Sequence, residues 1–246
     1  MTVVLATLTF VGLPVGRVYA DEALIAVASN FSVVAESLVA DFEAVHPHEI
    51  RISTGSTGKL YAQILRGAPF DVFLAADQHR PERLVEVGRA IAETQRTYAR
   101  GRLVLLSSTG PVKDGAVRLR SNSFRTLAIA NPDLAPYGVA AREVLASLGV
   151  LDMIEGRIVM GENIGQTYAL VATGNAELGL VAAAQVKGDE RAAGSWSVPA
   201  SMHAAIRQDV VLLTRASTNV AALAFLAYLE TPSARANIVA SGYEVE

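Results

Sequence analysis

Short runs of apolar residues alternate with amphipathic segments along most of the chain. The run at 23–28 (ALIAVA) precedes a segment, 31–45, whose apolar residues recur at helical spacing. A short, continuous apolar run is typical of a parallel strand that is covered on both faces. Strand-like segments at 49–52 and 72–75 each lead into a further helical pattern. We therefore predict a βαβαβ unit with a parallel sheet.

A second unit of the same plan begins at residue 127. Its strand-like and helical segments follow in turn at 127–130, 139–148, 157–160, 166–173 and 178–183. Between the two units we expect one long strand over 98–108. A strand at 206–213 and helices at 219–229 and 233–241 end the chain, and these helices are expected to return to the first unit.

The pattern as a whole predicts an α/β protein of two lobes with a ligand cleft between them. The chain would cross once near residue 100 and return near residue 200. Lobe 1 would then comprise 21–100 and 200–246, and lobe 2 would comprise 101–199. The 246 residues suffice for two domains of about 100 residues each. Each lobe would be a mostly parallel sheet flanked by helices, a class that binds ligands at the carboxyl ends of its strands.

The first twenty residues differ from the rest. Residues 2–16 are almost wholly apolar, and Val18-Tyr19-Ala20 precedes Asp21 in the manner of a small-residue cleavage site. We interpret 1–20 as a secretory signal peptide, although no Lys or Arg precedes the apolar run. A retained membrane anchor is the alternative, but the run is short for a span of about 20 residues. Export and cleavage would leave a soluble mature chain.

Composition narrows the function further. The formal charge of −3 does not favour nucleic-acid binding, which usually needs a basic surface. The absence of cysteine excludes disulfides, thiolate metal sites and a cysteine nucleophile. No G-x-S-x-G motif is present, and Asp71 and Asp77 alone do not form an acid–base pair. The four histidines are interpreted as solvated residues and not as metal ligands: His46, His48, His79 and His203. We therefore expect no enzyme, no cofactor and no directly coordinated metal cation.

The segment 53–58 (STGSTG) joins a strand to a helix and is the strongest candidate for a binding loop. Its glycines allow successive N–H groups to face one concavity, and a helix start adds unpaired donors and a positive dipole end. A small oxyanion would suit this seat. An ordinary βα loop capped by its hydroxyls is the alternative. A nucleotide P-loop would require glycine at Ser53 and a hydroxyl residue at Leu60.

Three other predicted strand-to-helix loops carry neutral donors. They contain Ser29-Asn30, Pro136-Tyr137-Gly138 and Asn163-Ile164-Gly165, and Lys59 is the one cation next to any of the four loops. Backbone amides and hydroxyls can hold a buried anion when its oxygens are fully hydrogen-bonded. The four loops together predict an uncharged pocket for a dianion.

Six segments, taken in order, resemble the periplasmic molybdate-binding proteins of ABC transporters, within the type II periplasmic binding protein fold. They are 26–31 (AVASNF), 53–58 (STGSTG), 67–77 (GAPFDVFLAAD), 131–138 (NPDLAPYG), 161–166 (GENIGQ) and 176–181 (AELGLV). The resemblance covers essentially all of the chain after residue 20. It implies a periplasmic, monomeric receptor that binds molybdate or tungstate and delivers it to an inner-membrane ABC permease.

The same resemblance assigns the oxyanion ligands, largely through main-chain N–H groups in the second lobe. The ligands are Ser29, Asn30, Thr57, Tyr137 and Ile164, with Ser56 and Gly58 supporting the second loop. Some family members have a binding tyrosine where this chain has Ala182, and the resemblance implies that Asn30 substitutes as a donor. Alternatives are a receptor for another oxyanion or a small organic acid, or a secreted enzyme on the same fold. The enzyme would need an acid–base or metal group in the cleft.

Overall fold

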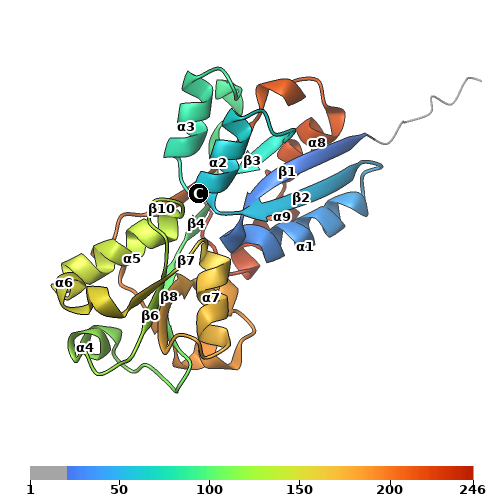
Figure 1. Cartoon of the computed structure of the whole chain (residues 1–246). Helices are drawn as coiled ribbons and strands as arrows, with labels where there is room; N and C mark the ends of the chain where they lie inside the picture. The colour runs from blue at the N-terminus through green and yellow to red at the C-terminus, as the bar shows by residue number, and fades with distance from the viewer. Residues whose placement is uncertain (1–20, 246) are drawn as a thin grey trace, which may run out of the picture.

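The computed structural model describes residues 21–245 and contains two five-stranded mixed sheets flanked by helices (Figure 1). The expected signal peptide at 1–20 lies outside the described residues. The first sheet has the order β2 (Glu49–Gly55), β1 (Glu22–Ala28), β3 (Val72–Leu74), β10 (Ile206–Leu212) and β4 (Arg96–Gly101). The second has the order β7 (Ile158–Gly161), β6 (Leu127–Ala130), β8 (Leu178–Ala182), β5 (Leu103–Ser107) and β9 (Trp196–Ser197). The predicted α/β class is confirmed.

Helices cover both faces of each sheet, which explains why β1, β3, β5, β6 and β8 are almost wholly apolar. On the first sheet one face carries α1 (Ser32–Glu43), α8 (Val220–Tyr228) and α9 (Pro232–Ala240), and the other carries α2 (Thr57–Leu65) and α3 (His79–Glu86). On the second sheet one face carries α4 (Gly115–Arg120), α5 (Pro136–Ser147) and α6 (Leu151–Ile154), and the other carries α7 (Ile164–Ala172). Among the described residues, no helix is long and apolar enough to cross a membrane.

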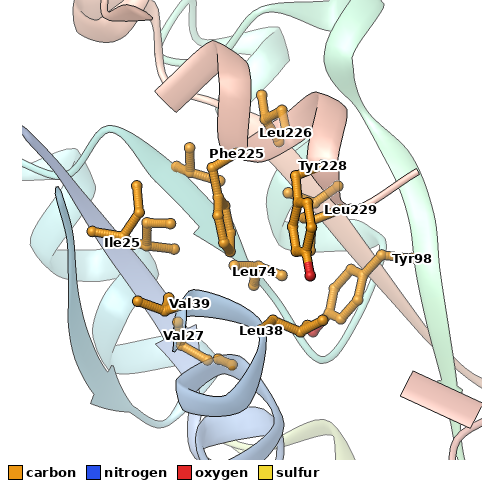
Figure 2. Close-up of a cluster of buried hydrophobic side chains, with 14 of the residues drawn as sticks. Ile25, Val27, Leu38, Val39, Leu74, Tyr98, Phe225, Leu226, Tyr228 and Leu229 are labelled. Carbon is orange, nitrogen blue, oxygen red and sulfur yellow. The ribbon is translucent and has the colours of Figure 1, made fainter. Parts of the chain in front are cut away.

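The helix α8, the second-last helix of the described chain, closes the core of the first sheet (Figure 2). Phe225 and Tyr228 of α8 face Leu38 of α1 and Ile25 of β1 across this core. The ring of Phe225 meets Phe42 edge-to-face at 5.4 Å between centroids, a favoured aromatic geometry. Burial of β1, the first strand of the described chain, thus requires α8, which lies almost 200 residues later.

The strand expected over 98–108 is wrong as a single element. It is two strands, β4 and β5, which lie in different sheets and are separated by Arg102. Tyr98 packs in the core of the first sheet, whereas Leu103 packs in that of the second. A single straight strand cannot place both of these residues in their separate cores, so the chain passes from the first sheet to the second at Arg102. It returns between β9 and β10, over residues 198–205.

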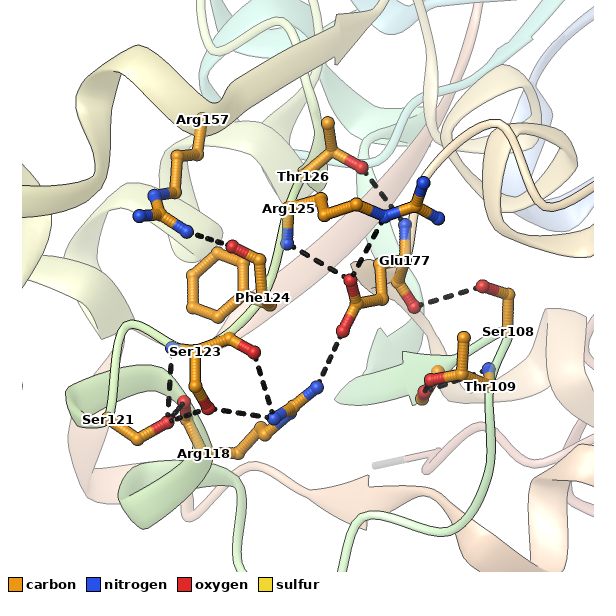
Figure 3. Close-up of polar contacts among 11 residues, drawn as sticks. Ser108, Thr109, Arg118, Ser121, Ser123, Phe124, Arg125, Thr126, Arg157 and Glu177 are labelled. Carbon is orange, nitrogen blue, oxygen red and sulfur yellow. Dashed lines mark hydrogen bonds and ion pairs between the residues drawn. The ribbon is translucent and has the colours of Figure 1, made fainter.

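A cluster of polar side chains around Glu177 fixes the loop that precedes β6 in the second sheet (Figure 3). Glu177 is buried, and its carboxylate accepts from Arg118 Nη2 at 2.6 Å and from the main-chain N–H of Arg125 at 3.0 Å. These bonds satisfy the charge of the buried carboxylate. We assign the cluster a structural role.

Candidate anion-binding site

Three of the predicted site residues lie in the first turn of a helix. Thr57 begins α2 and Ile164 begins α7, and Tyr137 is the second residue of α5. The prediction of loops at Tyr137 and Ile164 is therefore corrected: Pro136 is favoured at a helix start, and the Asn163 side chain caps α7 by accepting from Gln166 N at 2.9 Å. The first amides of a helix have no partner within it, so they can bind an anion.

The structure brings these helix starts together at the junction of the two sheets. Ala28, the last residue of β1, and Ala76, two residues after β3, share one buried apolar cluster with Tyr137 and Ile164. Thr57 joins them because its Oγ1 accepts from the main-chain N–H of Ala76 at 3.2 Å. An oxygen that accepts this bond keeps its own hydrogen free to donate.

Ser29 and Gly165 also meet across this junction. Ser29 opens a short 3-10 helix (Ser29–Phe31) directly after β1, and its Cβ lies 3.7 Å from the point that a Cβ on Gly165 would occupy. The half-buried hydroxyl of Ser29 thus approaches the start of α7, next to Ile164. All of the predicted loops converge on one place.

Ser56 and Gly58, the two residues expected to support the second loop, lie at the start of α2. Ser56 Oγ caps α2 by accepting from Lys59 N at 3.3 Å. The Gly58 N–H donates to Leu134 O at 2.8 Å and so joins the two sheets' loops. A Cβ on Gly58 would lie only 3.1 Å from the Leu134 backbone, which is why glycine is needed for this close approach.

The expectation that the Asn30 side chain donates to the anion is not supported by its hydrogen bonds. Asn30 Nδ2 donates to Gln208 Oε1 at 2.8 Å and to the Tyr243 hydroxyl at 3.0 Å. An amide nitrogen has two hydrogens, and both are engaged. Only the main-chain N–H of Asn30 remains as a donor.

Behind the site lies a buried polar network that sequence reasoning missed. Gln208 is fully buried on β10, accepts from the Tyr98 hydroxyl at 3.3 Å and donates to the Tyr137 hydroxyl at 3.4 Å. Burial raises the pKa of Tyr98, Tyr137 and Tyr243, so the network stays uncharged. The Tyr137 hydroxyl occupies space that a side chain on Gly101 would fill. The one signal in the sequence was the polar run Arg207-Gln208-Asp209 within a predicted strand.

Charged contacts join the two sheets around this site without entering it. Lys59 Nζ pairs with Glu162 Oε2 at 2.7 Å, and Arg80 Nη2 donates to Asp133 O at 3.0 Å. Within the described residues no group of three or more His, Cys, Asp or Glu could hold a metal ion. His48, expected to be solvated, is instead buried, and its Nδ1 accepts from Asp21 N at 3.4 Å.

Comparisons with known proteins identify relatives of the whole described chain. Residues 23–244 match the protein family described as "Bacterial extracellular solute-binding protein". The molybdate-binding protein ModA of Azotobacter vinelandii is 45% identical over 230 residues, which are 92% of this chain and 91% of the relative. ModA of Rhodobacter capsulatus is 42% identical over 92% of this chain and 90% of the relative. The solved Azotobacter vinelandii periplasmic molybdate-binding protein superposes with a TM-score of 0.86 at 38% identity, covering 91% of this chain and 99% of that one.

Proposed function

Because the chain belongs to the bacterial extracellular solute-binding proteins, we propose that it captures molybdate or tungstate between its two sheets and delivers the anion to an ABC permease. The relatives are binding proteins, in agreement with the expectation that the chain is not an enzyme. The observation that carries the proposal is the convergence of three helix starts and the Ser29 hydroxyl at one uncharged junction.

The donors would surround the anion from both sheets. The hydroxyls of Ser29 and Thr57 and the main-chain N–H of Asn30 would bind from the first sheet, and the main-chain N–H groups of Tyr137 and Ile164 from the second. A hydrogen bond to a charged group contributes about 1.5–3 kcal/mol, so these donors together suffice for tight binding without a cation. Neutral dipoles also release the anion without breaking an ion pair.

Each sheet with its helices would act as one lobe, with lobe 1 formed by 21–100 and 200–246 and lobe 2 by 101–199. The two crossings, at Arg102 and over 198–205, would serve as the hinge. Residues 1–20 would direct export to the periplasm, where the monomeric receptor meets the permease of the inner membrane.

Selection among dianions must come from size, because sulfate, molybdate and tungstate carry the same charge near neutral pH. Donors fixed on two rigid lobes would fit the larger tetrahedra and fall short of sulfate. Each donor left unpaired on closure costs about 1–3 kcal/mol, and several would be unpaired at once. We expect molybdate and tungstate affinities within about tenfold of each other.

Native mass spectrometry and competition calorimetry test the proposal. Purified protein should retain or take up one heavy oxyanion, and sulfate or phosphate should not displace it at millimolar excess. Ser29→Ala should weaken molybdate binding by about ten- to a hundredfold, whereas Ile164→Ala keeps its N–H and should change little. Stoichiometric displacement by sulfate would show a general oxyanion receptor, and exclusive binding of a carboxylate would show a receptor for an organic acid.

A further inference from the structure

Gln185 has a buried polar atom that no group of the protein satisfies. The residue lies in the 3-10 helix that follows β8 (Ala183–Val186), and its Oε1 is buried without a hydrogen-bond partner. Among the described residues no hydrogen bond of this side chain occurs. Native proteins pair about nine-tenths or more of their buried polar groups, so an amide without any partner in the protein points to a partner outside it.

The Gln185 amide reaches the start of α7. Its Nε2 lies 3.8 Å from the point that a Cβ on Gly165 would occupy, and Ser29 Cβ lies 3.7 Å from the same point. Because Gly165 has no side chain, Gln185 and Ser29 both approach the first turn of α7, where the Ile164 N–H is proposed to bind the anion.

A cavity connects this amide with the first sheet. The cavity has a volume of about 320 Å³, and Ser29, Asn30 and Gln185 are among the residues that line it. Lys187 and Tyr168 also line the cavity, with a cationic and a hydroxyl-bearing side chain. Gln185 therefore lies between the proposed anion seat and a space large enough to hold water or a small anion.

We propose that Gln185 is a further ligand-binding residue, whose side-chain NH₂ donates to the captured oxyanion beside Ser29 and Ile164. The inference rests on the proposed function. In the observed orientation the NH₂ group lies toward Gly165 and Ser29, and no described group of the protein accepts a hydrogen bond from it. An oxyanion bound at the start of α7 would be this acceptor, because an amide NH₂ group can only donate. The amide oxygen would be hydrated by water in the cavity that Gln185 lines.

Two substitutions of similar size separate a donor from a packing residue. Gln185→Met removes the donor and should weaken molybdate binding by about tenfold, mainly through faster dissociation. Gln185→Glu puts a carboxylate beside the dianion and should weaken binding by about a hundredfold or more. Both variants should keep the thermal midpoint of the ligand-free protein. Gln63→Met, on the exposed face of α2, is the matched control and should bind as wild type does.

Stopped-flow kinetics and calorimetry with sodium molybdate decide the matter, with Ser29→Ala measured in parallel. If Gln185→Met binds within twofold of wild type while Ser29→Ala binds more weakly, the proposed function stands and Gln185 is not a ligand. If Gln185→Met lowers the free energy of unfolding of the ligand-free protein by as much as it lowers the free energy of molybdate binding, the residue has a packing role and the inference is also overturned. If wild type binds no oxyanion, the proposed function itself fails.

Discussion

Replacing Gln208 by leucine should weaken the hydrogen bonds that hold Asn30 and Tyr137, one on each side of the proposed binding site. Gln208 is fully buried on β10 and joins Asn30, Tyr98 and Tyr137 by hydrogen bonds. Leucine has a similar size but no donor or acceptor. The change therefore removes the amide from the network while filling most of its space.

The structure allows the cost to be estimated bond by bond. Asn30 Nδ2 loses the acceptor that lies 2.8 Å from it, so one of its hydrogens is left unpaired, which costs about 1–3 kcal/mol of stability. The Tyr98 hydroxyl keeps its bond to Ala75 O at 3.2 Å, so its loss is small. The Tyr137 hydroxyl loses only a long 3.4 Å bond, worth about 0.5–1.5 kcal/mol or less. The total is about 2–4 kcal/mol of stability.

Thermal unfolding and molybdate calorimetry measure the two consequences. For a chain of this size each kcal/mol lowers the midpoint by about 2–4 °C, so a fall of about 4–16 °C is expected. Because Asn30 and Tyr137 also carry proposed main-chain donors, affinity should fall by about tenfold or more. Gln63→Leu on the exposed surface of α2 is the control and should cost no more than about 0.5 kcal/mol.

A Gln208→Leu protein that unfolds within about 1 °C of wild type would refute this estimate, because an unpaired buried donor cannot be without cost. A large loss of stability with unchanged affinity would refute the link between the network and the anion donors. In that case the network would hold β10 and β4 together without positioning the site.

Three further changes test the site and its surroundings. Thr57→Val should weaken molybdate binding by about tenfold or more, and it should also leave the buried main-chain N–H of Ala76 without an acceptor. Thr57→Ser should retain both hydrogen bonds, so equal effects of the two variants in calorimetry would contradict the role of the hydroxyl. Lys59→Met removes the exposed pair with Glu162, so the molybdate dissociation rate should rise by no more than about fivefold, and the difference should vanish at about 1 M salt. The hydrogen bond from Arg191 holds the pKa of Asp189 well below its usual range, so its stabilisation is present above about pH 4 and lost as pH falls through the folded pKa. The difference in midpoint between wild type and Asp189→Asn should accordingly be largest at neutral pH and shrink in acid.

The order of the main elements and the convergence of the candidate loops could be predicted from local patterns in the sequence. Apolar runs at 23–28 and 127–130 predicted strands that are buried on both faces, because side chains on both sides of such a run must find a core. The capping by hydroxyls that the sequence offered as the alternative for 53–58 occurs at Ser56, because a hydroxyl beside a helix start can accept from one of the first amides. Helix starts after parallel strands gather at one edge of a sheet, so the convergence of the candidate loops could be predicted from the sequence alone.

Tertiary structure decided which of those polar groups remain available to a ligand. The side chain of Asn30 is occupied by Gln208 and Tyr243, partners that lie 178 and 213 residues away along the chain. The division of 98–108 at Arg102 likewise depends on which core each half enters. A capping bond or an apolar period is formed by neighbours in the sequence and can be read from it. The buried hydrogen bond from Asn30, shortly after β1, to Gln208 on β10 exists only after the sheet has formed, because β3 lies between β1 and β10 and sets their distance.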